Sequence, residues 1–164
     1  MRYTGEVMVS SASVHAPISA VARRRARRGL VQHLVTADET SLVELQALLA
    51  TLPMCATGRV FIEVPDASWV GPLPVPGRMI VTWLDRSARS GTPGSGRACG
   101  RGTALTRAAT AWADEMMCAD GDDTEVHLMG GYLGTAQIVD HLVERRGRAA
   151  ASVHAPARYG LGTC

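Results

Sequence analysis

The amino-acid sequence predicts an α/β fold, a Rossmann-like doubly wound sheet of about five mainly parallel strands with helices on both faces. Short apolar segments rich in β-branched residues alternate along the chain with segments whose apolar residues recur at helical spacing. The strand segments lack the strict polar alternation of a half-exposed antiparallel sheet, which favours a parallel sheet covered on both faces. A chain of 164 residues fits one such domain.

A strand followed by a helix opens the domain. Residues Leu30–Thr36 form a short apolar, partly β-branched run that is typical of a buried strand. In Leu42–Leu52, leucines recur at spacings of three and four, which predicts a helix with one apolar face. Either Thr40 or Ser41 is the expected N-cap, and Pro53 stands just beyond the end of the helix.

Two further strands are predicted at Arg59–Val64 and Arg78–Leu84, where apolar residues again dominate. The connection between them, Pro65–Gly77, contains four prolines and two glycines, so no long helix is expected there. The segment Ser87–Gly102 contains five glycines and few large apolar side chains. This composition predicts a loop.

Two helices and two strands complete the predicted order. A helix is predicted at Ala104–Met117 and a strand at Glu125–Met129. A glycine turn then precedes a helix at Thr135–Arg146 with Gly147 as its C-cap, and Ala150–His154 is the expected fifth strand. The residues expected on the inner sides of the two helices are Leu105, Ala108, Ala109, Trp112, Met116, Ile138, Val139, Leu142 and Val143.

Charge divides the chain into an arginine-rich arm, residues 1–28, a domain, residues 29–156, and a short tail, residues 157–164. The arm has six arginines and one acidic residue, a net charge of +5, whereas the rest has eleven arginines and fourteen acidic residues, a net charge of −3. The arm either binds phosphates or an anionic surface, or is a solvated linker. No aromatic side chain interleaves its arginines, so nucleic-acid binding is not the expected function.

The composition excludes several classes of protein. The chain has no lysine, which excludes P-loop, Schiff-base and lysine-base chemistry, and the absence of asparagine as well indicates a high-GC bacterial source. Its four cysteines lie far apart and no secretory leader pattern is present, so we expect free thiols in a cytoplasmic protein. No apolar run approaches the roughly 18 residues of a membrane span.

No metal site is expected from the sequence. His33 and His127 fall within predicted strands, where we expect buried, hydrogen-bonded core residues. The acidic residues Asp120, Asp122 and Asp123 are most simply a solvated turn. The segment SVHAP occurs twice, at residues 13–17 and 152–156, either because both copies are extended or by chance.

The ends of the predicted strands carry motifs in a fixed order. These are DET after a strand, LP at the end of a leucine-rich helix, EV and WL-x-R at the ends of two strands, a glycine turn, and a helix ending in HLVERRG. Over roughly residues 30–156 this order resembles the C-terminal NAD(P)H-binding domain of siderophore-interacting proteins, the ferric-siderophore reductases of the ferredoxin-reductase superfamily. The segments concerned are Asp38–Thr40, Leu52–Pro53, Glu63–Val64, Trp83–Arg86, Gly130 and His141–Gly147.

The resemblance implies a site for NADPH or NADH at the carboxyl ends of the strands. The acidic segment after the first strand would line the dinucleotide cleft, and the arginine after the third strand would meet a phosphate, such as the 2′-phosphate of NADPH. The glycine pair after the fourth strand would let backbone amides approach the ligand. The implied cofactor-binding residues are Asp38, Glu39, Thr40, Arg86, Gly130 and Gly131.

Purely structural roles are open for the same residues. Asp38 and Thr40 can end a strand and cap a helix. Arg86 can pair with Asp85 or Asp66 at the surface, and the glycine pair can simply mark a turn. No GxGxxG fingerprint follows the first strand.

Three departures from the family pattern leave the function open. Residues 1–28 are too few for the family's flavin-binding β-barrel, so we expect no flavin site in this chain. The pair Gly130–Gly131 replaces the family's Gly-Glu, and Ala157–Gly160 differs from its aromatic GYWRRG segment. Two functions follow: an NAD(P)H-binding component of a ferric-siderophore reductase with flavin supplied elsewhere, or a non-catalytic binding or regulatory module. The expected partner is a flavoprotein, a regulatory protein or a second copy of the chain.

Overall fold

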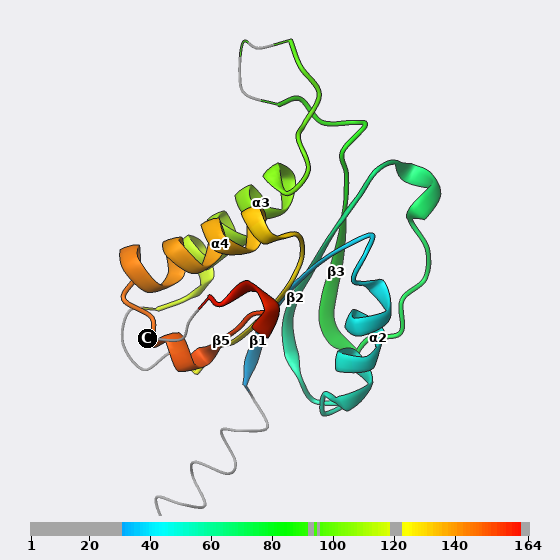
Figure 1. Ribbon diagram of the computed structural model, residues 1–164. Coiled ribbons are helices and arrows are strands. Elements are labelled where there is room, and N and C mark those ends of the chain that lie inside the picture. The colour runs from blue at the N-terminus through cyan, green and yellow to red at the C-terminus, as the bar shows by residue number, and fades with distance from the viewer. Residues whose placement is uncertain (1–30, 92–93, 95, 119–122, 162–164) are drawn as a thin grey trace, which may run out of the picture.

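A five-stranded, all-parallel sheet forms the centre of the protein. The computed structural model describes residues 31–91, 94, 96–118 and 123–161, so the arginine-rich arm and the first SVHAP segment lie outside the described residues. The strands lie in the order β3-β2-β1-β4-β5 (Figure 1), and the predicted fold class is confirmed. The strands are β1 (Gln32–Asp38), β2 (Thr57–Val64), β3 (Arg78–Asp85), β4 (Glu125–Met129) and β5 (Val153–His154).

Helices cover both faces of this sheet (Figure 1). Helix α2 (Leu42–Thr51) packs on one face, and α3 (Thr103–Met116) and α4 (Tyr132–Asp140) pack on the other. Successive strand residues point to opposite faces, so two apolar clusters form, one on each side. The α2 cluster includes Val35, Ala37, Leu45, Leu49, Val60 and Ile62, and the α3–α4 cluster includes Leu34, Phe61, Leu105, Ala109, Leu128 and Ile138.

The end of α3 differs from the prediction by one side chain. Met116 was expected on the inner face of the helix, but it is half-exposed, and Met117 is buried in its place. The reason is that the helix ends at Met116 and the backbone of Met117 becomes extended. This change of direction turns the Met117 side chain back into the core.

The last helix begins earlier than expected, and the last strand is shorter than expected. Gly130 follows β4 and Gly131 is the N-cap, so α4 begins at Tyr132, earlier than predicted, and it continues as a π-helical turn to Arg145. Gly147, with φ of +65°, follows this helical segment, as predicted. The alanine-rich start of the expected fifth strand forms a 3₁₀ turn instead, because alanine has a low preference for strands.

The strand order creates a switch point between β1 and β4. These two strands are neighbours in the sheet, but the chain leaves β1 towards α2 on one face and leaves β4 towards α4 on the other. In open α/β sheets such a divergence opens a crevice at the carboxyl ends of the two strands. A ligand site is therefore expected at this edge of the sheet.

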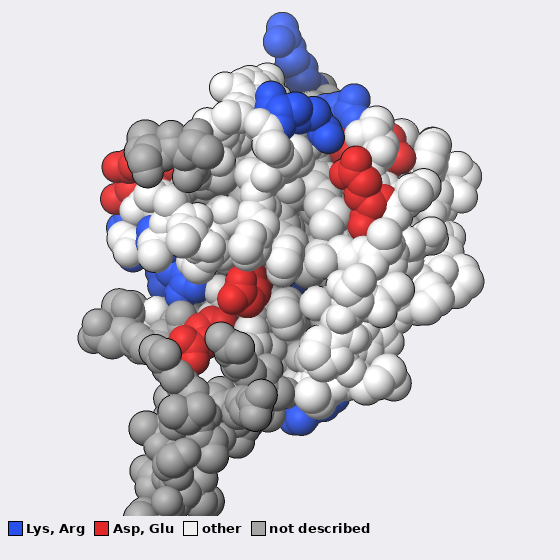
Figure 2. Space-filling model, turned by 60° about the horizontal axis from the view of Figure 1, so that its bottom comes forward, with Lys and Arg blue, Asp and Glu red and all other residues white. Residues whose placement is uncertain are grey.

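Charged side chains are scattered in small groups over the described surface. On the face shown in Figure 2, arginines and acidic residues occupy separate patches between large uncharged areas, without a continuous basic surface among the described residues. None of the helices in the described ranges combines the length and the hydropathy needed to cross a bilayer.

Candidate functional site at the carboxyl edge of the sheet

The carboxyl end of β1 places Asp38 at the centre of the candidate site. This residue is buried, and its Oδ1 accepts hydrogen bonds from the backbone N–H and the hydroxyl of Thr40, at 3.0 and 2.6 Å. Its Oδ2 accepts from the N–H of Gly131 at 3.0 Å and from Arg101 at 3.2 Å. Burial alone would raise the pKa of Asp38, but the Thr40 hydrogen bonds and the charge of Arg101 hold it below its ordinary value. An ionised carboxylate thus ties β1 to the start of α4.

Arg86, which follows β3, joins two carboxylates. Its two terminal nitrogens donate to both oxygens of Glu39 at 3.1 Å, and Nη1 also donates to Glu63 Oε1 at 3.2 Å. The hydrogen bonds to Glu39 are the main cause of the raised pKa of Arg86. Burial works to raise the pKa of Glu39, but the Arg86 hydrogen bonds, a backbone hydrogen bond and the charges of Arg86 and Arg101 together hold this pKa below its ordinary value.

Glu63, at the end of β2, is fully buried and caps α3 from the sheet. Its Oε1 accepts the N–H of Gly102 at 2.7 Å, and its Oε2 accepts the N–H of Leu105 at 2.8 Å. Gly102 is the N-cap and has φ of +81°, a left-handed conformation that favours glycine. Because the helix dipole stabilises a negative charge here, Glu63 fixes where α3 begins.

Arg101 is the most open cation of this group. Its side chain is 51% exposed, and one nitrogen, Nη2, lies 3.2 Å from Asp38 Oδ2 and 3.4 Å from Glu39 Oε1. The rest of its guanidinium makes no hydrogen bond to another described residue. We refer to the five charged residues as the strand-end network: Asp38, Glu39, Glu63, Arg86 and Arg101.

The glycine pair after β4 borders the network. Gly131 is the N-cap of α4, and no side chain caps this helix from the N-cap position. The carbonyl of Gly130 accepts a hydrogen bond from the Tyr159 hydroxyl at 3.0 Å, and the Tyr159 ring meets the Tyr132 ring edge-on. Backbone, a carboxylate and two aromatic rings therefore lie together where β4 ends.

The structure brings the residues singled out from the sequence to one edge of the sheet. The acidic segment after β1 and Arg86 are connected through Glu39, and the glycine pair contacts Asp38. Their roles in cofactor binding stay predictions. The surface partners considered for Arg86 were wrong: Asp85 accepts from Ser87 and Asp66 accepts from Ser68. Arg86 instead turns inward across the end of β2, where a buried carboxylate needs a cation.

Sequence reasoning missed three members of the site, Glu63, Arg101 and Tyr159. A signal for Glu63 was present, since a glutamate inside an apolar strand segment must find partners when it is buried. Arg101 lies in a glycine-rich loop and Tyr159 in the segment after β5. Only the folded arrangement brings those two segments to the site.

Comparison with known proteins decides which family this chain belongs to. The family model described as siderophore-interacting protein matches residues 30–157. The chain belongs to the siderophore-interacting protein family. The resemblance inferred from the strand-end motifs is confirmed. Comparison with curated protein sequences found no match.

Two solved structures of siderophore-interacting proteins share the fold. SipS from Aeromonas hydrophila matches with a TM-score of 0.57 and 17% identity, over 76% of this chain and 49% of that chain. The protein from Acinetobacter baumannii matches with a TM-score of 0.56 and 12% identity, over 76% of this chain and 44% of that chain. At such identities the likeness shows the fold alone. The chain spans less than half the length of either protein.

Proposed function

We propose that this chain binds NAD(P)H at the carboxyl edge of its sheet and serves in ferric-siderophore reduction, with flavin supplied elsewhere. The C-terminal domains of this family are in general NAD(P)H-binding. The observation that carries the proposal is the switch point between β1 and β4, where α2 and α4 diverge and where Asp38 meets the glycine pair. The bound dinucleotide would supply hydride, and the chain would hold and orient it.

Arg101, rather than Arg86, is the cation that we assign to a cofactor phosphate. Arg86 is 15% exposed and held by two carboxylates, so moving it would leave the buried charge of Glu63 without its ion pair. Arg101 is half-exposed and contacts its carboxylates through a single nitrogen. Its free N–H groups offer a phosphate the charge-assisted hydrogen bonds that guanidinium groups form well.

The acidic members of the network suit the sugar part of a dinucleotide. Ionised carboxylates accept hydrogen bonds from ribose hydroxyls, as the acidic residue of dinucleotide-binding sites does. Asp38 and Glu39 also repel phosphate, so a diphosphate would lie on the exposed side of the Arg101 guanidinium, away from both carboxylates.

Calorimetry with NADPH and with NADH tests this proposal. The variant Arg101→Gln is expected to weaken binding about tenfold, the loss of one charge-assisted hydrogen bond. Arg78→Gln is the matched control, because Arg78 is exposed at the amino end of β3 and should bind as the unchanged protein does. If neither dinucleotide binds at millimolar concentration, the proposal is wrong.

A non-catalytic binding module is the second candidate function, and one observation favours it. Every charged side chain of the strand-end network already has a partner within the network, and the N–H of Gly131 is already bound by Asp38. A dinucleotide must compete with these contacts. Size-exclusion chromatography with a candidate flavoprotein separates the two functions, because a module of this kind should assemble without any dinucleotide.

A further inference from the structure

A row of histidines crosses three neighbouring strands away from the carboxyl edge. His33 on β1, His127 on β4 and His154 on β5 stack ring on ring, with centroids 6.0 Å apart for the first pair and 4.8 Å apart for the second. His127 and His154 are register partners of the parallel β4–β5 pair. The row lies on the α2 face, because it alternates with residues such as Leu34 and Leu128 that point to the opposite face.

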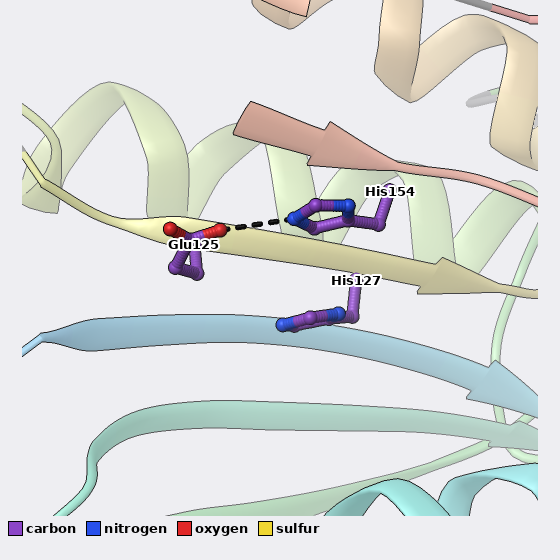
Figure 3. Close-up of side chains that lie close together, drawn as sticks. All are labelled: Glu125, His127 and His154. Carbon is purple, nitrogen blue, oxygen red and sulfur yellow. Dashed lines mark hydrogen bonds and ion pairs between the residues drawn. The ribbon is translucent and has the colours of Figure 1, made fainter. Parts of the chain in front are cut away.

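A carboxylate completes this group. Glu125 precedes His127 by two positions on β4, so both side chains lie on one face of the sheet. An oxygen of Glu125 lies 3.0 Å from Nε2 of His154, and Figure 3 shows both side chains beside the His127 ring. One potential ligand atom from each of these three residues lies within 4.8 Å of the others.

We propose that Glu125, His127 and His154 form a binding site for a divalent transition-metal ion, with Zn²⁺ the ion that their chemistry fits best. Two imidazoles and one carboxylate with an open fourth position are a ligand set that zinc accepts. Tetrahedral zinc with bonds of about 2.0–2.1 Å places its ligand atoms about 3.3 Å apart. The Glu125 oxygen and Nε2 of His154, 3.0 Å apart, are already near this spacing. Rotation of the His127 ring would bring one of its nitrogens to a similar distance from both atoms.

The surroundings of His127 support the assignment. Within the described part of the chain its ring makes stacking contacts but no hydrogen bond. Nδ1 of the neighbouring His33 is buried without a hydrogen-bond partner among the described residues. Since buried polar atoms are nearly always paired, this side of the sheet has polar groups still to be satisfied.

An ion can reach the three ligands from solvent. A hollow of about 410 Å³ lies beside them, lined by His127, His154, Pro156 and Arg158, among others. His154 is exposed and Glu125 is partly exposed, so the ion would keep a solvent-facing position. The site shares no residue with the strand-end network, and its test is therefore independent of dinucleotide binding.

Isothermal titration calorimetry tests the proposal. Zn²⁺ is titrated into the tag-free full chain after a chelator has removed bound metal. We expect one ion per chain, and a loss of affinity of at least about tenfold in each of His127→Gln, His154→Gln and Glu125→Gln. His141→Gln is the matched control, because His141 lies 2.8 Å from Asp114 and the two have no third potential ligand beside them among the described residues. Its affinity should equal that of the unchanged protein.

Substitution with Co²⁺ identifies the ligands by spectroscopy. Four-coordinate Co²⁺ bound by nitrogen and oxygen should absorb in the visible range without the near-ultraviolet band that a thiolate ligand adds. That band would assign the ion to the cysteines and overturn the proposal. The proposal is also wrong if the unchanged protein binds no Zn²⁺ below millimolar concentration. It is equally wrong if the variant His154→Gln, which changes an exposed side chain and should keep the same circular dichroism, binds Zn²⁺ as tightly as the unchanged protein.

Discussion

The strand-end network and the histidine row lie on the same sheet and differ in how completely their polar groups are paired. In the network, each carboxylate meets a guanidinium, a backbone N–H or both. In the row, His33 Nδ1 has no partner among the described residues and His127 makes only ring contacts. The comparison teaches that a ligand must compete with existing contacts for the groups of the network, whereas the histidine row has unpaired nitrogens that can coordinate an ion.

The largest expected effect comes from breaking the network at its buried end. Glu63→Ala removes the cap of α3 and leaves Arg86 with one carboxylate fewer, so we expect a loss of about 3–5 kcal/mol in the free energy of unfolding. Urea unfolding followed by circular dichroism measures it. Glu115→Gln, an exposed substitution on the same helix, is the control and should change stability by less than about 0.5 kcal/mol. Equal effects of the two variants would mean that Glu63 does not hold the helix.

Acid should destabilise the protein, because two carboxylates of the network have lowered pKa values in the folded state. The pKa values of Asp38 and Glu39 lie below their ordinary values, so the unfolded chain binds more protons than the folded chain in acid. Their contribution is complete above about pH 5 and is lost as the pH falls through the ordinary carboxyl range near 4 and on to the lowered native pKa values. The pH dependence of urea unfolding between pH 6 and pH 3 measures it. The variant Asp38→Asn should be less stable than the unchanged protein at pH 6, but it should lose less stability between pH 6 and pH 3. If its stability falls with pH as steeply as that of the unchanged protein, this assignment is contradicted.

The smallest expected effect comes from the histidine row. Without added metal, His154→Gln should change the free energy of unfolding by less than about 0.5 kcal/mol, because the side chain is exposed and its contact with Glu125 is a surface pair. Thermal unfolding with and without Zn²⁺ sharpens the comparison. The unchanged protein should be stabilised by the ion and the variant should not. A large loss of stability in the metal-free variant would place the row with the network as a structural group.

Much of the fold could be predicted from the sequence, because the pattern of apolar residues along each segment matches the residues that the fold buries. The strand Glu125–Met129 lies where the apolar run predicted it, and α2 differs from its prediction by one residue. The fifth strand could not be predicted well, because its length depends on how far β4 offers a pairing edge to an alanine-rich segment. Its small side chains carry little signal of their own.

The location of the candidate site could be predicted from the sequence, but the pairing of its side chains could not. Parallel strands bring their carboxyl ends to one edge, so residues such as Asp38 and Arg86 were expected together. Which carboxylate Arg86 meets depends on the direction of its side chain across β2, and the sequence does not encode that locally. His127 and His154 were missed as a pair for a related reason, since only the register between β4 and β5 places them side by side.

The buried cap on α3 has a consequence for engineering the protein. Because a carboxylate from β2 fixes the first turn of this helix, the start of the helix is held from the sheet and not only by the connection that leads into it from β3. The backbone pairing of Ser90 with Ala98 closes the base of that connection. A reporter peptide or an affinity tag inserted beyond this base should leave the domain folded, which makes the connection a permissive site for labelling.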